Sequence, residues 1–223
     1  MKRANVWGII LISIILLPSY ILPYWFIIKE SAASRSKFKI KRLSFSADLT
    51  YRDQEMVIKC TADFTINNID RLFDSKLDCD NLISEFKFKD SKLFSQQIKS
   101  KGKYFAKFIS HLAENGDLIL PLPISSENLR NRICHIVNEC SYVKYKRLAG
   151  TINYQFLSRE SGNYYMVDKE SFLPTALFIK DKNINIEAKK YYNFSTNIKF
   201  PSVIELQIEK QYVILNIEEV EVE

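Results

Sequence analysis

Two neighbouring stretches of the chain alternate between apolar and polar side chains: residues 42–51, RLSFSADLTY, and residues 56–66, MVIKCTADFTI. Successive side chains of a β-strand point to opposite faces of a sheet, so this period of two is typical of strands with one buried face. Residues 52–54, Arg-Asp-Gln, separate the two stretches and suit a turn. We therefore predict that residues 42–66 form an antiparallel hairpin with one apolar and one wet face.

Strand patterns also dominate the rest of the chain, with two helical patterns in its middle. An amphipathic helix is predicted over 103–114, ended by Asn115-Gly116, and a short extended run follows at 118–122. A second helix begins after the capping pair Ser125-Ser126. The further predicted strands are 70–77, 82–89, 152–156, 163–167, 175–180, 184–188, 200–208 and 212–222.

This order of elements defines the expected fold class, which is mainly β (α+β). We predict one domain over residues 43–223, built as a large curved antiparallel sheet of about 9–11 strands with two helices against its concave face. Residues 43–223 contain neither an internal repeat nor a linker rich in Gly, Pro or Ser.

The N-terminal part of the chain has a different character. Residues 6–28, VWGIILISIILLPSYILPYWFII, contain no charged side chain, and as a helix they would span about 34 Å, enough to cross a bilayer. We predict a single transmembrane helix over residues 1–28, followed by a basic juxtamembrane segment over 29–42. The alternative is a signal peptide cleaved after Ser31-Ala32-Ala33, although the apolar run is longer than signal peptides usually have.

The distribution of charge argues against nucleic-acid binding. The whole chain has a net charge of +6, but residues 1–42 hold eight of the 32 Lys and Arg and one of the 26 Asp and Glu. Residues 43–223 therefore hold 24 basic and 25 acidic side chains, whereas a nucleic-acid-binding domain carries its own basic surface. The basic excess lies beside the apolar segment, where anionic lipid headgroups attract Lys and Arg.

The orientation in the membrane is left open by these charges. The six basic residues in 29–42 favour a cytoplasmic domain by the positive-inside rule. Lys2-Arg3 ahead of the apolar run favour export instead, as in a signal sequence. Four cysteines (60, 79, 134 and 140) permit disulfides outside the cytoplasm, with three alternative pairings, or could be buried as small apolar groups. We expect the domain to be exported.

No catalytic or metal-binding motif is present in the sequence. The two histidines, His111 and His135, belong to no metal-binding spacing, and Cys134-His135 with Cys140 lacks a fourth ligand. Gly-rich phosphate loops and the GxSxG pattern of hydrolases are absent. We therefore expect neither an enzyme nor a cofactor.

Four strand-and-turn motifs in residues 150–204 follow one another. They are GTINYQF (150–156), YMVD (165–168), FLPTALF (172–178), and KYYNF (190–194) with FPSVI (200–204). This series resembles the C-terminal half of the outer-membrane lipoprotein-sorting proteins, the LolA-like family of lipoprotein carriers, and LSFSADL (43–49) resembles their first strand. The initial amphipathic helix of that family is reduced here to residues 31–42, and an uncleaved anchor differs from a soluble shuttle.

The resemblance implies an open half-barrel whose apolar concave face takes acyl chains. The alternative is that the same side chains form a dry core. The residues expected to face a lipid-binding cavity are Phe45, Ile58, Phe64, Phe86, Phe105, Phe108, Ile152 and Phe156.

Three functional hypotheses follow. The first is a single-pass inner-membrane protein whose periplasmic domain binds a membrane lipid, or the acyl chain of a lipid or lipoprotein, in outer-membrane lipoprotein or lipid sorting. The second is a non-enzymatic structural or interaction subunit of an envelope complex, with an envelope protein as partner and a filled core. The third is an anchored component of lipopolysaccharide export, which would have a jelly-roll stack of sheets.

Overall fold

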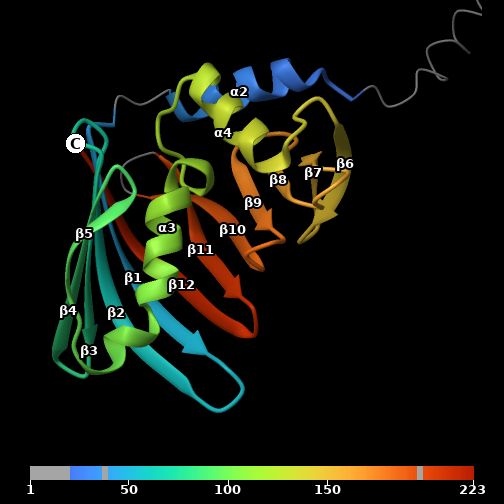
Figure 1. The fold of residues 1–223 in the computed structure, drawn as a ribbon. Helices are drawn as coiled ribbons and strands as arrows, with labels where there is room; N and C mark the ends of the chain where they lie inside the picture. Colours follow the sequence, from blue (N-terminus) through green and yellow to red (C-terminus); the bar gives the residue numbers. More distant parts are fainter. Residues whose placement is uncertain (1–20, 37–39, 195–197) are drawn as a thin grey trace, which may run out of the picture.

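The computed structural model describes residues 21–36, 40–194 and 198–223. Within these residues the strands form one antiparallel twelve-stranded sheet in the order β5-β4-β3-β2-β1-β12-β11-β10-β9-β8-β7-β6 (Figure 1). The strands are β1 Arg42–Arg52, β2 Val57–Asn67, β3 Leu72–Cys79, β4 Leu82–Lys89, β5 Lys92–Gln97, β6 Val143–Leu148, β7 Thr151–Leu157, β8 Tyr164–Asp168, β9 Pro174–Ile179, β10 Ile184–Asn193, β11 Lys199–Ile208 and β12 Gln211–Val222. The prediction of a mainly β, open antiparallel fold is confirmed.

The predicted hairpin over 42–66 is formed by β1 and β2. Alternate residues of both strands are buried, as their sequence pattern predicts. Phe45 lies directly opposite Phe64, and their rings stack with centroids 4.7 Å apart. This aromatic pair stabilises the centre of the sheet from its apolar face.

The sheet consists of two antiparallel meanders that meet at β1 and β12. Leu43 of β1 lies opposite Val222 of β12, and the backbone amide of Lys41 donates a hydrogen bond of 2.8 Å to the carbonyl of Glu223. On one side β1 to β5 follow each other in chain order, and on the other side β6 to β12 do the same. The first and last strands are therefore central, and β5 and β6 are the two edges.

Three α-helices and one short 3₁₀-helix pack on the sheet in the part of the chain that the structure describes. They are α2 Tyr24–Ser36, η1 Ser100–Tyr104, α3 Ala106–Ile119 and α4 Ser126–Val137. Figure 1 shows α3 lying across the concave face, with α2 and α4 over one end of the sheet. Phe105, Phe108 and Leu112 are buried against the sheet, and Tyr51 of β1 contacts both phenylalanine rings with centroids 6.0 Å away. Under α3, apolar side chains fill the concave face.

The predicted end of the first central helix is wrong. Asn115 and Gly116 lie inside α3, which continues to Ile119, so the predicted extended run 118–122 begins as helix. The Asn115 amide donates to the carbonyl of His111 within the helix, and both Asn115 and Gly116 are buried. Tertiary packing here overrides the weak helix propensity of the Asn-Gly pair.

Two strands have no counterpart in the predicted series. Strand β5 is exposed along its whole length, and β6 has no fully buried residue. Both are sheet edges, so they lack the alternating burial from which a strand is recognised.

Helix α2 corrects the expected reduction of the initial helix to residues 31–42. It includes residues 24–28 of the predicted anchor and residues 29–36 of the predicted basic segment. Ile27, Ile28 and Ala32 are buried in the same core as the sheet. Residues 1–20 of the predicted transmembrane helix lie outside the described residues, and no helix among the described residues is long and apolar enough to cross a bilayer.

The four cysteines form two disulfide bonds. Cys60 of β2 is bonded to Cys79 of β3, and Cys134 of α4 is bonded to Cys140 just beyond that helix. This selects one of the three pairings that the sequence leaves open. It also excludes the Cys134-His135-Cys140 group as a metal site, because both sulfur atoms are used.

Candidate functional site

A pocket of about 520 Å³ opens at the end of the molecule where α3 passes into α4. It lies between the β2–β3 and β4–β5 turns on one side and α3, the linker 120–125 and α4 on the other. We call it the mouth pocket. Its lining residues are Ile66, Asn67, Asn68, Arg71, Leu72, Phe73, Asp90, Ser91, Ala113, Gly116, Asp117, Leu122, Pro123, Ile124, Asn128, Asn131 and Arg132.

The lining combines an apolar wall with a polar rim. The wall is formed by the ends of β2 and β3, one face of α3, and the linker residues Leu122, Pro123 and Ile124. The rim carries four asparagines and the charged residues Arg71, Asp90 and Arg132, among others. A concave apolar surface with a few polar groups around it is typical of sites for small organic ligands, and the volume falls within their usual range of about 300–1,000 Å³.

Helix α3 contributes small residues to the wall. Ala113 and Gly116 are three positions apart, so they share one face of the helix. A Cβ atom added at Gly116 would meet only the Cδ1 atom of Leu120, at 3.7 Å. The small side chains let the pocket reach the helix backbone, and larger side chains at these positions would fill it.

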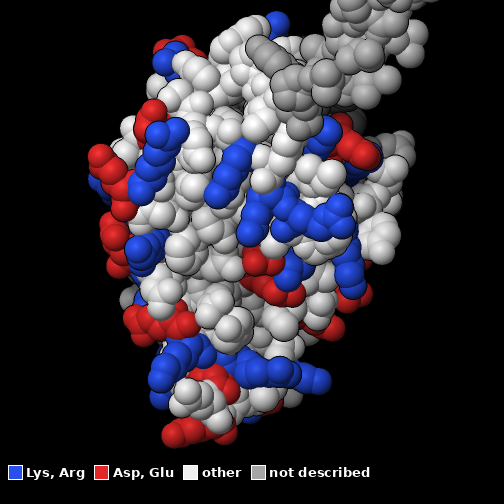
Figure 2. Space-filling view, turned by 90° about the vertical axis from the view of Figure 1, so that its right-hand side faces the viewer, with Lys and Arg blue, Asp and Glu red and all other residues white. Residues whose placement is uncertain are grey.

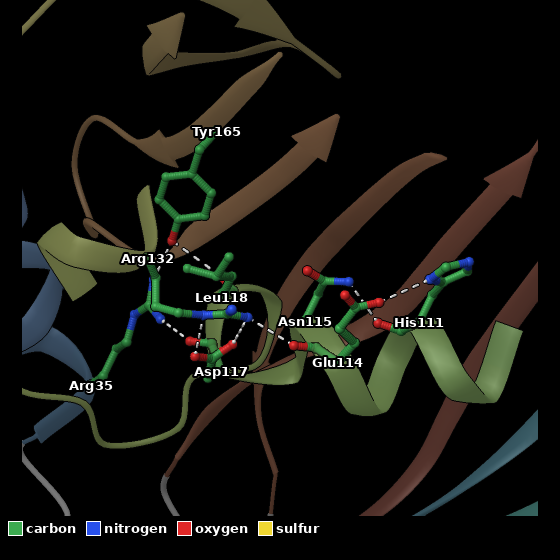
Figure 3. A network of polar contacts seen from close by, with 8 residues as sticks. All are labelled: Arg35, His111, Glu114, Asn115, Asp117, Leu118, Arg132 and Tyr165. Atoms are coloured by element: carbon green, nitrogen blue, oxygen red, sulfur yellow. Dashed lines mark hydrogen bonds and ion pairs between the residues drawn. The ribbon is translucent and has the colours of Figure 1, made fainter. Parts of the chain in front are cut away.

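A bidentate ion pair joins α4 to the last turns of α3 beside the pocket. Arg132 donates from Nε to Oδ2 of Asp117 at 2.9 Å and from Nη2 to Oδ1 at 3.0 Å (Figure 3). Its Nη2 also donates to the carbonyl of Glu114 at 2.8 Å. On the opposite rim, Arg71 and Asp90 form a looser and exposed pair at 3.4 Å. The α3–α4 side of the mouth pocket is therefore more firmly held than the side formed by the turns.

The buried guanidinium of Arg35 fixes α2 to the same helix end. Its Nη1 donates to the carbonyl of Asp117 at 2.8 Å, and its Nη2 donates to the hydroxyls of Ser31 and Tyr165. The Tyr165 hydroxyl in turn donates to the carbonyl of Leu118 at 3.1 Å (Figure 3). These carbonyls lie in the last turn of α3, where helix carbonyls lack partners and the helix dipole favours positive charge.

Burial sets the protonation of the tyrosines around this contact. Desolvation raises the pKa of Tyr165, although the neighbouring Arg35 partly opposes the shift. Desolvation likewise raises the pKa of Tyr191, whose hydroxyl donates to the carbonyl of Pro174 at 2.6 Å. Both phenols therefore remain neutral hydrogen-bond donors, which suits a structural rather than a catalytic role.

The residues predicted to face a cavity do not line the mouth pocket. Seven of the eight are buried in the core that joins the sheet to its helices, namely Phe45, Ile58, Phe64, Phe86, Phe105, Phe108 and Phe156. The eighth, Ile152 at the start of β7, is 42% exposed and lies outside this enclosed interior. The pocket residues come instead from strand ends, turns, the helix linker and the facing sides of α3 and α4. Among the apolar lining residues, Ile66, Leu72, Phe73, Ala113 and Leu122 lie in elements predicted from the sequence. Nothing in those patterns indicates that they meet at one pocket, because its turn and linker residues have no periodicity.

Comparison with known proteins shows the fold. Neither protein-family models nor curated protein sequences give a match. Among solved structures, a LolA superfamily protein from Nitrosomonas europaea superposes with a TM-score of 0.53 at 7% identity, over 91% of this chain and 94% of that chain. An outer membrane lipoprotein-sorting protein domain from Vibrio parahaemolyticus has a TM-score of 0.48 at 8% identity, over 89% and 92%. A DUF1329 family protein from Desulfovibrio piger has a TM-score of 0.46 at 9% identity, over 90% and 93%.

The chain therefore has a LolA-like fold, an open antiparallel sheet with helices over its concave face. The resemblance that the strand-and-turn motifs of residues 150–204 indicate is confirmed at the level of the fold.

Proposed function

We propose that this chain is a non-enzymatic binding protein of the bacterial cell envelope that holds an acyl chain, from a lipid or a lipoprotein, in the mouth pocket. Its N-terminal segment anchors it in the inner membrane, and its domain lies in the periplasm. The observation that carries the proposal is the position of the mouth pocket, between the open end of a LolA-like sheet and its helices. The apolar wall suits an aliphatic chain, and the rim asparagines and arginines suit the polar group attached to it.

The periplasmic location is supported by the cysteines. All four are paired in disulfides, which persist in oxidising compartments such as the periplasm and are rare in the cytosol. Residues 6–23, the part of the uncharged run that precedes α2, have Lys2-Arg3 ahead of them and support an anchor that enters the membrane with its N-terminus inside.

An interaction subunit is the second candidate, and two observations favour it. The concave face under α3 is filled by apolar side chains, and the mouth pocket lies at the end of this face rather than beneath the helix. In addition, the edge strand β5 is exposed and carries Leu93 and Phe94, which are 43% and 59% exposed. An unpaired and partly apolar edge can accept a strand from a protein partner.

A photoreactive fatty acid distinguishes these candidates. The full chain is reconstituted in lipid nanodiscs, irradiated with the diazirine-labelled acid, and digested for mass spectrometry. We expect labels on the α3–α4 linker and on the β2–β3 turn, in addition to labels on the N-terminal segment.

A matched pair of variants localises the binding. Ala113→Phe places a ring in the mouth pocket and should reduce labelling of the linker at least fivefold. Ala106→Phe makes the same change two turns earlier on α3, where the residue is also partly buried but does not line the pocket, and should leave labelling unchanged. Labels confined to the N-terminal segment, with none on the linker, would exclude the carrier role and favour the interaction subunit.

A further inference from the structure

Two segments of the domain carry basic residues without any acidic residue between them. Residues 141–158 contain Lys144, Lys146 and Arg147 and no Asp or Glu, and residues 188–204 contain Lys189, Lys190 and Lys199 and no Asp or Glu. A third such segment, residues 91–113, contains five lysines and no Asp or Glu, but two of them, Lys101 and Lys107, form ion pairs with Asp80 and Glu209. The first segment includes the edge strand β6, and the second includes the adjoining ends of β10 and β11.

One hollow of about 610 Å³ joins the two segments on the surface. Its lining runs from Leu148 and Ala149 at the β6–β7 turn to Lys189, Lys190 and Lys199. Figure 2 views the molecule from the side on which β6 lies in Figure 1, and Lys and Arg side chains form an uneven band above the centre of the view.

Ion pairs distinguish Lys189 from the other five cations, and an uncommon backbone conformation distinguishes Lys190. Lys189 is neutralised by Glu187 at 2.9 Å and Glu205 at 2.7 Å. Lys190 has a φ of 53°, a left-handed conformation that interrupts the pairing of β10 with β11 without shifting its register.

We call the five remaining cations, Lys144, Lys146, Arg147, Lys190 and Lys199, the basic face. Among the described residues none of the five forms an ion pair. The acids that line the same hollow are Asp168 and Glu170, and Oδ1 of Asp168 is occupied by the amides of Glu170 and Ser171 and by the Ser171 hydroxyl.

Exposed apolar side chains accompany these cations. Tyr192 is 58% exposed two residues after Lys190, and Ile152 is 42% exposed and pairs with Arg147 across the β6–β7 hairpin. Trp25, at the start of α2, is 57% exposed. An exposed Tyr close to Lys, as Tyr192 is to Lys190, is a combination found at the headgroup layer of membranes.

We propose that the basic face docks on an anionic phospholipid surface, that of the membrane which anchors the chain. This inference rests on the proposed anchor. The apolar run of residues 6–28 overlaps α2, which begins at Tyr24 and packs on the domain, so no linker separates the run from the domain. In Figure 1 α2 begins on the side of the molecule where β6 lies. The short connection therefore holds the basic face close to the headgroups. Each Lys or Arg near an anionic membrane surface raises the affinity for that surface about fivefold.

Lysine acetylation of the full chain tests this docking. The chain is reconstituted in nanodiscs of phosphatidylcholine alone and in nanodiscs with about 30% phosphatidylglycerol, a fraction chosen to resemble an anionic leaflet. Acetylation rates of single lysines are measured by mass spectrometry. In anionic discs we expect Lys144, Lys146, Lys190 and Lys199 to react at least threefold more slowly than in neutral discs. Lys59, Lys76 and Lys87, exposed on β2 to β4, serve as internal references and should not change. The difference should disappear in 0.5 M salt, because screening shortens electrostatic reach to a few ångströms.

Charge reversal supplies the control. Lys146→Glu combined with Arg147→Glu should abolish the protection of Lys190 and Lys199, whereas Lys87→Glu combined with Lys89→Glu should retain it. Equal acetylation in the two kinds of disc, or protection that survives the β6 reversal, would overturn the docking.

Retention of the chain by the discs is recorded in parallel. Loss of the chain from neutral discs would mean that the anchor has failed. Retention by anionic discs alone would still support the basic face, and retention by neither would refute it. Acyl-chain labelling in the mouth pocket is measured separately, so a failure of acyl-chain binding is distinguished from a failure of membrane docking.

Discussion

At the scale of single residues, Arg35 is notable as a charged side chain that is buried in the protein. Its side chain is 1% exposed, it forms no ion pair with a carboxylate among the described residues, and its Nε has no hydrogen-bond partner there. The last turn of α3 compensates, because the carbonyls of Asp117 and Leu118 are reached by Arg35 and by Tyr165. Sequence analysis places Arg35 in a basic segment beside the membrane. Two of its three partners, Asp117 and Tyr165, are 82 and 130 residues away, and nothing in a local pattern could have indicated them.

Replacing Arg35 tests this account. In Arg35→Met the Asp117 carbonyl loses its donor and Tyr165 loses a partner, while the cost of burying a charge is also removed. We expect a net loss of about 1.5–3 kcal/mol in the free energy of unfolding, the usual range for hydrogen bonds to a charged group. Guanidinium unfolding of the detergent-solubilised chain, followed by circular dichroism, measures the loss. Arg42→Met, at an exposed position on β1, should change stability by less than about 0.5 kcal/mol. An equal effect of the two substitutions would contradict the role of Arg35.

His111 makes a second residue-scale prediction, which concerns pH. Burial lowers the pKa of His111 below its ordinary value of 6.5, although the adjacent Glu114, 3.4 Å away, partly opposes the shift. The unfolded chain therefore takes up a proton at this position before the folded chain does. The stability that the neutral imidazole contributes is complete above pH 6.5 and declines as the pH falls below it. The stability difference between pH 7.5 and pH 5.5 should be smaller in His111→Gln than in the unsubstituted chain. An unchanged difference would show that His111 does not contribute.

At the scale of elements, long alternating patterns predicted structure well and irregular ones did not. Strands β1 and β2 bury alternate residues as their sequences indicate, because both have a neighbour on each side and one face on the core. Strand β5 is an exposed edge and gave no such pattern. The end of α3 that was predicted from Asn115-Gly116 is too early, because burial keeps both residues in the helix. The mouth pocket could not be predicted for the same reason, because turns and a linker form much of it.

The two disulfides stabilise elements of different size, and this difference is measurable. Cys60 and Cys79 are 19 residues apart, whereas Cys134 and Cys140 are 6 residues apart. In the chain-entropy account, the longer loop contributes about 3 kcal/mol and the shorter about 2 kcal/mol to stability. The double substitution Cys60→Ala with Cys79→Ala should therefore lower the free energy of unfolding more than Cys134→Ala with Cys140→Ala. The reverse order in guanidinium unfolding would mean that native packing, rather than loop closure, determines these contributions.

At the scale of the whole molecule, the fold has a filled core in one region and a pocket open to solvent in another. The centre of the sheet and α3 form a filled core, and the predicted cavity residues of that region are packed within it. The open volume lies at one end, between turns and the helix linker. A binding role for this chain thus depends on the helices over the mouth, and the variants at Ala113 and Ala106 address that role without disturbing the sheet.

The meeting of β1 and β12 at the centre of the sheet also affects how the chain acquires its structure during synthesis. Of the described strands β12 is made last, yet it is the one that joins the two meanders. Before it is available, a nascent or translocating chain can form two half-sheets whose unpaired edges, β1 and β11, are rich in apolar residues. Such edges aggregate readily. The sheet should therefore be completed only after synthesis of the last described strand, and its completion should depend on chaperones that protect the half-sheets until β12 is inserted.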